Sequence, residues 1–314
     1  MAGAAHVETP MSRFFVSGLI NLETTLAVEG FPIPYFPARY PFFGIQTAVS
    51  GVGFNITSAL TVLGNRVDFA ALIGSDDNAM LVRKALNENG MDDKLVKNAV
   101  SATAQSVILY DPQGRREIHV DLKDIQETNY PVQVAQAAIM ECDLAVICNI
   151  NFSRPLLQAA GEAGKQIATD VHALADLGDE YNRDFMAAAD ILFLSDESLP
   201  DSPEQTAREL IRLYNSQMVV IGMGEKGALL AYPQDDFVGR FPAVQVRPVV
   251  NTIGAGDALF SAFLDRFVKT GDPYRSLQAA LVFASYKIGE KGAAQGFLTG
   301  EALEGWLAKF DRPD

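Results

Sequence analysis

The chain has 314 residues, of which 48% are hydrophobic and 20% charged, with 25 glycines and 15 prolines. This composition excludes collagen-like, low-complexity and largely disordered proteins, and the length suits one large α/β domain. The net charge of −14 arises from 25 basic and 39 acidic residues. Such a charge repels phosphate backbones and anionic lipid, so neither a nucleic acid nor a membrane is expected as a partner.

The apolar segments, the first residues and the cysteines of the sequence predict a cytoplasmic protein. No apolar run reaches the roughly 18 to 20 residues of a membrane helix, and residues 1–12 (MAGAAHVETPMS) lack the pattern of a signal peptide and are expected to form a loose tail. The two cysteines, Cys142 and Cys148, flank a short apolar stretch where free thiols pack as small hydrophobic groups. The three histidines lie far apart in the sequence, so no zinc site is expected.

Strands and helices alternate from residue 13 onward. The apolar segment 13–20 (RFFVSGLI) predicts a buried strand, and the proline- and aromatic-rich segment 28–47 predicts an edge ribbon or flap that would serve as a lid. A glycine-rich turn then enters a helix over 51–64, followed by a strand over 67–74 and a helix over 75–90. This alternation is typical of a parallel sheet.

A β-hairpin at 105–121 interrupts the alternation, because QSVILY and REIHVD flank the turn-forming stretch DPQGR. Together with 28–47, this hairpin is expected to form a small antiparallel sheet beside the main domain. Two helices, 255–270 and 273–289, are expected to close the chain. Between them and the hairpin we expect buried strands in 143–150, 165–171, 190–195 and 217–223, helices around 131–141, 153–163, 179–188 and 203–215, and a hairpin-like insert from 227–232 and 237–246.

The segment 251–257 (NTIGAGD) precedes an apolar helix and carries the sharpest chemical signal. Its glycines at a helix start leave backbone N–H groups free, and the helix dipole adds positive charge there, so the segment predicts an anion hole for a phosphoryl group. Asp257, in the first turn, is placed to accept a proton from a hydroxyl that attacks this group. A plain glycine-rich turn with a capping aspartate is an equally good interpretation of the spacing alone.

Two further clusters contain residues suited to binding. The segment 222–227 (GMGEKG) joins two apolar runs, and glycine at a strand end lets a phosphate or a flat ring approach, although a plain turn is the alternative. Near the start, Asn21 and Glu23 follow the first strand, and 50–55 (SGVGFN) opens a helix. Asn and Glu side chains suit the recognition of hydroxyl groups. Alternatively, Asn55 caps a turn and Glu23 is solvated.

Together these clusters resemble the ribokinase-like (PfkB) family of carbohydrate and nucleoside kinases. NTIGAGD resembles the family's DTxGAGD signature, GMGEKG its TLGEKG nucleotide motif and SGVGFN its GGxGxN motif, in the family's order from about Arg13 to Phe297. The resemblance implies a three-layer α/β fold with a mostly parallel central sheet, helices on both faces and a small β-sheet lid. It also implies a single domain over 13–314, with the lid formed from about 24–49 and 103–123.

The resemblance assigns roles position by position, with ATP and Mg²⁺ as cofactors and K⁺ expected near the catalytic loop. Asp257 is implied as the catalytic base. The expected anion-hole residues are Ile253, Gly254, Ala255 and Gly256; the nucleotide-binding residues are Gly222, Gly224, Gly227, Asn251 and Thr252; and the acceptor-binding residues are Asn21, Glu23, Gly51, Gly53, Asn55 and Asn151.

Three positions depart from the family pattern. Asn251 replaces the opening aspartate, and Gly222 lacks a hydroxyl that relatives offer to the nucleotide. After the strand over 190–195, Ser195–Ser198 stands in place of the NxxE motif that helps to organise the Mg²⁺ shell, which leaves Glu197 as the candidate for a metal contact. Because the base and the anion hole are intact, we expect activity with an altered metal dependence.

We therefore expect an ATP-dependent kinase that phosphorylates a primary hydroxyl of a sugar or sugar derivative. The alternatives are a nucleoside kinase, in which aromatic residues of 35–43 stack on a base, and a non-catalytic binding protein that keeps the fold. A sugar phosphate acceptor is less favoured, because lid arginines such as Arg115 and Arg116 are expected to face solvent. The apolar residues of 31–43 predict a homodimer formed lid to lid.

Overall fold

The main sheet has nine strands in the order β13-β12-β11-β10-β9-β8-β1-β4-β5. The computed structural model describes residues 11–310, so the tail predicted for 1–12 lies almost wholly outside the described residues. All neighbouring strands pair in parallel, except that β12 pairs antiparallel with both β11 and β13 at one edge. The strands are β1 (Arg13–Ser17), β4 (Arg66–Ile73), β5 (Val96–Asn98), β8 (Leu144–Ile147), β9 (Ile167–Asp170), β10 (Ile191–Ser195), β11 (Met218–Gly222), β12 (Ala228–Tyr232) and β13 (Phe237–Phe241).

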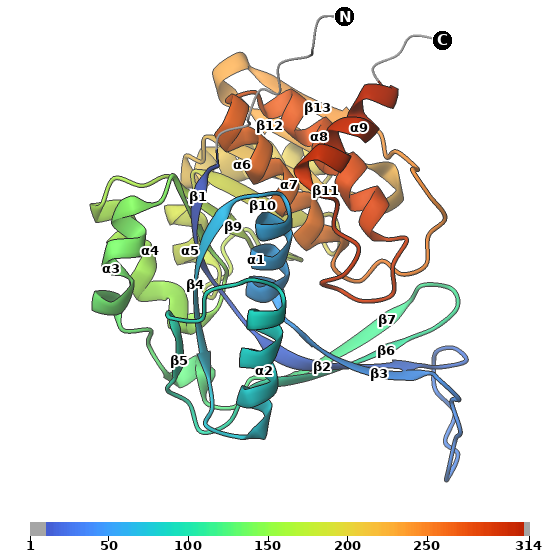
Figure 1. Cartoon of the computed structure of the whole chain (residues 1–314). Coiled ribbons are helices and arrows are strands. Elements are labelled where there is room, and N and C mark those ends of the chain that lie inside the picture. Colours follow the sequence, from blue (N-terminus) through green and yellow to red (C-terminus); the bar gives the residue numbers. More distant parts are fainter. Residues whose placement is uncertain (1–10, 311–314) are drawn as a thin grey trace, which may run out of the picture.

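Helices cover both faces of this sheet and give a three-layer fold (Figure 1). Alternate residues of β1 point to opposite faces, as the strand period of two requires: Val16 belongs to one core and Phe15 to the other. The first core is closed by α1 (Val52–Val62), α2 (Asp77–Glu88), α7 (Ala255–Thr270), α8 (Pro273–Lys287) and α9 (Gly300–Phe310). The second is closed by α3 (Val132–Glu141), α4 (Arg154–Glu162), α5 (Arg183–Ala188) and α6 (Pro203–Tyr214).

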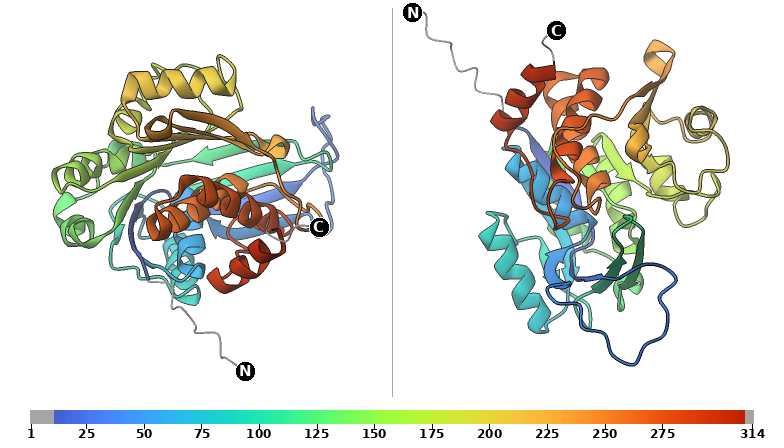
Figure 2. Two further views of the ribbon diagram at one scale, coloured as in Figure 1. Left: turned by 90° about the horizontal axis from the view of Figure 1, so that it is seen from above. Right: turned by 90° about the vertical axis from the view of Figure 1, so that its right-hand side faces the viewer.

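A second sheet of four strands, in the order β3-β2-β6-β7, forms the lid. Its strands are β2 (Asn21–Ala27), β3 (Ile45–Ser50), β6 (Gln105–Tyr110) and β7 (Arg116–Asp121). Figures 1 and 2 show the sheet projecting from one end of the main body, below α7 and α8 in Figure 1. Residues 28–44 form an irregular loop at its far end.

Several predicted elements differ from the structure. The lid sheet is mixed and not antiparallel, because β2 and β6 pair in parallel. The first strand ends at Ser17, and Asn21 opens the lid strand β2. A third helix, α9, follows the two that were predicted to close the chain, and the short strand β5 was not predicted. Within residues 11–310, no helix has the length and apolar composition that crossing a membrane requires.

Candidate active site

The carboxyl ends of the parallel strands meet the lid at a point where the strand order reverses. β1 lies between β8 and β4, so the connections leave it in both directions, and this switch point is where open α/β sheets bind ligands. Helix α1 packs against α7 at this point. A Cβ added to Gly53 would lie 2.5 Å from the backbone carbon of Gly18, so the start of α1 touches the end of β1.

Asp257 lies in the first turn of α7 with 8% of its surface exposed. Its Oδ2 accepts a hydrogen bond of 2.7 Å from Nδ2 of Asn55, and Oδ1 of Asn55 accepts a 3.3 Å bond from the hydroxyl of Ser50. Burial raises the pKa of Asp257 above its ordinary value, and the bond from Asn55 opposes this rise. Asn55 is thus a partner of Asp257, an arrangement different from the alternative of a simple turn cap. A raised pKa brings this carboxylate closer to the range of a general base.

The glycine loop before Asp257 shapes a binding surface for an anion. Gly254 has a φ of 75°, and a Cβ there would lie 2.6 Å from the carbonyl oxygen of Ala293, so only glycine fits without strain. A Cβ on Gly256 would meet nothing within 4 Å, so this side of the loop is open. The prediction of four anion-hole donors is wrong for two of them, because the N–H of Ile253 donates to Oδ1 of Asn251 and that of Ala255 to the carbonyl of Thr252. The N–H groups at a helix start have no acceptor within the helix, so Gly254 and Gly256 are the remaining donors of the loop. The loop therefore has the donors and the space that a phosphoryl group requires.

The lid places polar groups over this loop. Glu23 and Ser106 are register partners of β2 and β6, and they lie on one face together with Asn21, whose Nδ2 donates a 3.0 Å bond to the hydroxyl of Ser106. Ile108, two residues further along β6, packs against Ile253 of the catalytic loop. Burial raises the pKa of Glu23, and the charge of Asp257 raises it further. Asn21 and Glu23 thus belong to the inner face of the lid.

The predicted nucleotide glycines differ in their surroundings, and Gly222 lies beside the first turns of α7. A Cβ on Gly222, at the end of β11, would contact the side chain of Leu259 at 3.7 Å. Gly224 has a φ of 56° and borders open space, whereas a Cβ on Gly227 would overlap the carbonyl oxygen of Phe241 in β13. Gly224 is therefore free to border a ligand, and Gly227 has a structural reason to be glycine.

Three other predicted site residues have mainly local surroundings. Gly51, with a φ of 104°, lies against the carbonyl of Leu19 and opens α1. The side chain of Asn151 bonds to the carbonyl of Gln126 and to Arg154, and within residues 11–310 it has no hydrogen bond to the Asp257 cluster. Thr252 is exposed beside the loop.

Glu197 is exposed at the end of β10, and its carboxylate approaches the guanidinium of Arg116 on β7 to 3.9 Å. Within the described part of the chain, no group of three or more His, Cys, Asp or Glu side chains is arranged to hold a metal ion. Arg115, by contrast, pairs with Asp111 in its own hairpin turn. Both arginines are exposed, as expected, although the side chain of Arg116 also reaches toward the main body.

The sequence patterns missed three charged residues near Asp257. Asp170 ends β9 and His172 lies just beyond it, and their charges act on the pKa of Asp257 in opposite directions. Lys287, in the last turn of α8, is fully buried, and its ammonium donates a hydrogen bond to the carbonyl of Ile253. In the sequence, Lys287 is indistinguishable from the basic residues that commonly end helices, so only the three-dimensional structure identifies it.

Comparisons with known proteins agree with this geometry. The profile described as pfkB family carbohydrate kinase matches residues 12–299. The chain is 27% identical over 309 residues to the ATP-dependent ribose-1-phosphate kinase of Halopiger xanaduensis, a match that covers 96% of this chain and 100% of that protein. The microbiome-derived acarbose kinase Mak1 has a similar structure, with a TM-score of 0.85, 25% identity and coverage of 96% and 100% of the two chains. Ribokinase from Giardia lamblia shares the fold, with a TM-score of 0.81, 15% identity and coverage of 96% and 100%.

The ribokinase-like fold, the lid and the helix-start glycine loop thus occur together with a family match over nearly the whole chain. The chain belongs to the pfkB family of carbohydrate kinases and is an ATP-dependent enzyme of that family.

Proposed function

We propose that the enzyme transfers the γ-phosphoryl group of ATP to a primary hydroxyl of a sugar or sugar derivative, with Asp257 as the general base. The observation that carries this proposal is the pairing of the buried Asp257 carboxylate with Asn55 next to the open side of Gly256. A base and an anion hole one residue apart suit attack by a hydroxyl on a bound phosphoryl group. Asn21 and Glu23, on the inner face of the lid, would contact the other hydroxyls of the acceptor.

In this mechanism, Asp257 accepts the proton of the attacking hydroxyl as its oxygen forms a bond to the γ-phosphorus. The bond from phosphorus to the leaving oxygen of ADP breaks in line with this attack. Backbone N–H groups of Gly254 and Gly256 would stabilise the negative charge on the transferring group. The closed lid would exclude water from it.

The nucleotide would lie along Gly222, which borders the first turns of α7, and along Gly224, which borders open space. Asn251, Thr252 and Gly227 would shape the same region. Mg²⁺ bound to ATP would neutralise phosphate charge. Glu197, exposed at the end of β10, remains our candidate for a contact to that ion through water. We assign the whole of 13–314 to one kinase domain of the cytoplasm, with 24–49 and 103–123 as its lid.

The proposal is tested by measuring ADP release from Mg·ATP with a panel of pentoses, hexoses, keto-sugar acids, sugar phosphates and nucleosides. Asp257→Asn keeps the size of the side chain but cannot take a proton, so turnover should fall by about 10² or more while ATP binding, measured by calorimetry, is unchanged. Full turnover in this variant would remove Asp257 from the role of base. A response to nucleosides alone would favour the nucleoside kinase instead.

A sugar phosphate is the second candidate acceptor, and Arg116 is the observation that favours it. Arg116 and Tyr110 are register partners, so Arg116 shares the inner face of the lid with Ile108. A guanidinium in this position suits a phosphate group, and one relative is named a ribose-1-phosphate kinase. Arg116→Ala should then raise the KM for a sugar phosphate at least about tenfold, the scale of a lost charged hydrogen bond, and leave the KM for a neutral sugar unchanged.

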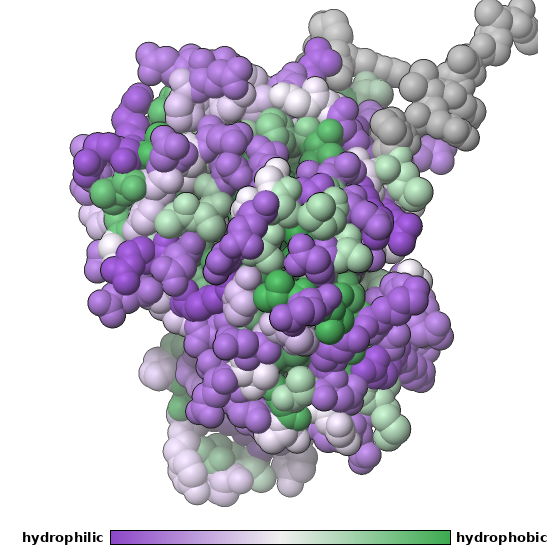
Figure 3. All heavy atoms as spheres, turned by 90° about the vertical axis from the view of Figure 1, so that its left-hand side faces the viewer, coloured by the Kyte–Doolittle hydropathy of each residue, from purple (hydrophilic) through white to green (hydrophobic). Residues whose placement is uncertain are grey.

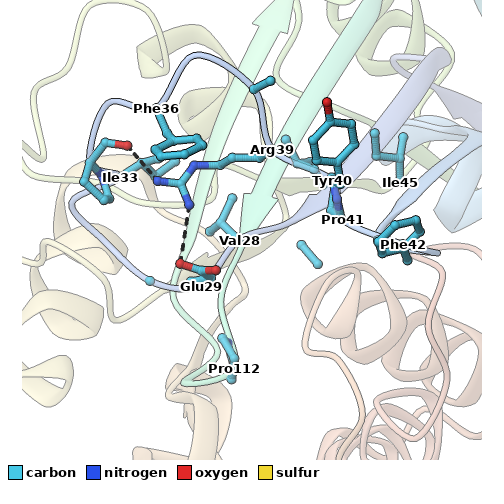
Figure 4. A pocket seen from close by; sticks show the side chains of 16 residues that line it. Val28, Glu29, Ile33, Phe36, Arg39, Tyr40, Pro41, Phe42, Ile45 and Pro112 are labelled. Atoms are coloured by element: carbon cyan, nitrogen blue, oxygen red, sulfur yellow. Dashed lines mark hydrogen bonds and ion pairs between the residues drawn. The ribbon is translucent and has the colours of Figure 1, made fainter.

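We also propose a homodimer formed through the lid. The loop 28–44 surrounds an apolar hollow of about 830 Å³, and Ile33, Phe36 and Phe42 are among the residues that line it (Figure 4). Tyr35 and Phe43, in the same loop, are 92% and 100% exposed. On the opposite side of the molecule, the face in Figure 3 is mostly hydrophilic with scattered hydrophobic residues. Apolar surface of this kind favours association with a second copy.

A further inference from the structure

Lys287 is a buried cation directly beneath the catalytic loop. Its side chain has no exposed surface, and its ammonium bonds to the carbonyl of Ile253, the first residue of the anion hole. Four charged groups act on it: Asp257 and Glu23 from the site, Glu290 from the following segment and Arg116 from the lid. Burial of an ammonium is costly unless hydrogen bonds and opposite charges compensate, so a specific arrangement holds this one.

Asn251 provides a second donor at the same loop. Its Nδ2 donates a 3.0 Å hydrogen bond to the carbonyl of Lys291, and its Oδ1 accepts a 2.6 Å bond from the N–H of Ile253. One partner is an acceptor and the other a donor, so together they fix the orientation of the amide. An aspartate here would place an oxygen against the carbonyl oxygen of Lys291, a repulsive contact unless a cation lay between them.

The loop and the segment after α8 are therefore joined at several points. The N–H groups of Val250 and Asn251 both donate to the carbonyl of Ile288, at 2.8 and 3.0 Å, and Gly254 packs on the carbonyl of Ala293. Backbone carbonyls of both segments thus accept hydrogen bonds from N–H groups of the chain.

These residues do not fit a potassium site. Potassium is bound by a ring of oxygen atoms, typically backbone carbonyls. Here the carbonyl of Ile253 already accepts a hydrogen bond from the ammonium of Lys287. Asn251 presents an N–H group at a position where an additional oxygen ligand would be required. The expectation of K⁺ near the catalytic loop therefore conflicts with the residues that are present.

We infer that Lys287 and Asn251 replace a monovalent cation, so that the chain supplies its own positive charge beneath the anion hole and the kinase does not depend on K⁺. Lys287 acts as a positioning residue through the carbonyl of Ile253. The inference goes beyond the proposed function, and only its turnover measurements rest on that function; its thermal measurements do not.

The first experiment compares the wild-type protein in KCl and in tetramethylammonium chloride at equal ionic strength. Tetramethylammonium is too large for a carbonyl cage, so it controls for salt alone. We expect the same Tm in both salts and a turnover that differs by less than about twofold, because a ligand that does not bind the folded state cannot stabilise it. A Tm that rises with K⁺ concentration, or a saturable activation of about threefold or more, would overturn the inference.

The second experiment uses the double variant Asn251→Asp/Lys287→Ala, which restores a carboxylate and empties the space of the ammonium. We expect its Tm and turnover to rise in KCl and not in tetramethylammonium chloride. Lys84→Ala, which removes an exposed lysine of α2, is the matched control and should show no response to either salt. A folded double variant without a potassium response would contradict the inference. If the double variant is unfolded in both salts, the wild-type comparison decides.

Discussion

At the scale of single residues, the protonation of Asp257 is set by burial and by one amide. Burial raises its pKa, whereas the hydrogen bond from Asn55 stabilises the carboxylate. Because only the carboxylate accepts a proton, activity should be lost as the pH falls through this raised pKa. In the window between the ordinary and the raised value, the folded state binds more protons than the unfolded state, so this group favours folding as the pH falls. As the pH falls through this window, protonation of Asp257 should therefore lower activity without lowering the stability of the fold.

Asn55→Ala tests this account. Removing the bond that favours the charged form should raise the pKa of Asp257 further, so the acid limb of kcat/KM should move to higher pH. The measurement is a pH profile of kcat/KM, with Asn89→Ala, at the exposed end of α2, as a control that leaves the limb in place. A limb that stays in place, or moves to lower pH in Asn55→Ala, would show that Asn55 does not tune the base.

Lys287 should produce an alkaline limb. Burial lowers its pKa to about 8, while Asp257 and Glu23 oppose this shift, Glu290 opposes it more weakly and Arg116 adds to it. Turnover should fall as the pH rises through about 8 and the ammonium loses its charge. The unfolded lysine keeps its proton to about pH 10, so between these values this group favours folding increasingly as the pH rises. Profiles of kcat and Tm from neutral to alkaline pH measure both effects, and an unchanged limb in Lys287→Met would assign it to another group.

At the scale of elements, glycines with different surroundings separate stability from catalysis. A Cβ on Gly53 would overlap the backbone of Gly18 at 2.5 to 2.8 Å, whereas one on Gly256 would enter open space. Gly53→Ala should therefore cost about 1–3 kcal/mol through overpacking. Gly256→Ala should leave the free energy of unfolding unchanged but lower kcat about tenfold or more, because its methyl group enters the space of the phosphoryl group. Chemical denaturation and steady-state kinetics measure the two effects, and equal losses of stability would refute the distinction.

The same elements show how far sequence patterns extend. Apolar runs and glycine or proline boundaries predicted the alternating strands and helices, because these signals are local. They missed α9, whose end-of-chain pattern was not separated from the preceding loop. They also extended β1 through the turn at 18–20 that leads to β2, because the apolar run continues there. The parallel pairing of β2 and β6 depends on which edges meet in space, a property that no local pattern encodes.

The candidate site shows the same difference between residues that local patterns predict and residues that only contacts distant in the sequence identify. The glycine loop and Asp257 were predicted because their chemistry lies in consecutive residues. Lys287 is more than thirty residues from Ile253, which it contacts, and Arg116 looked like an ordinary charge of a hairpin. The role of Lys287 follows from its burial and from a contact across the fold, and that of Arg116 from its place on the inner face of the lid.

At the scale of the whole molecule, the lid contacts the main body through one apolar cluster and one pair of opposite charges. Ile108 packs on Ile253 and Ala293, and Arg116 approaches Glu197 across the opening. The apolar contact links the lid to the same loop that would hold the phosphoryl group. A lid held in this way has one face over the site and leaves the other face available to a partner.

The loop 28–44 at the far end of the lid leads to the prediction of a dimer. Phe42 and Phe43 are 86% and 100% exposed at the end of the lid, which is unfavourable for a monomer in water. Light scattering at micromolar concentration should give twice the mass of one chain. Phe42→Ser/Phe43→Ser should shift the protein to the monomer, whereas Leu81→Ser, which removes a 49% exposed leucine from α2, should not. If the wild-type protein is a monomer, these aromatic side chains must serve another purpose. If the serine variant is monomeric but keeps its kcat, the dimer contributes to stability and not to the chemistry of the site.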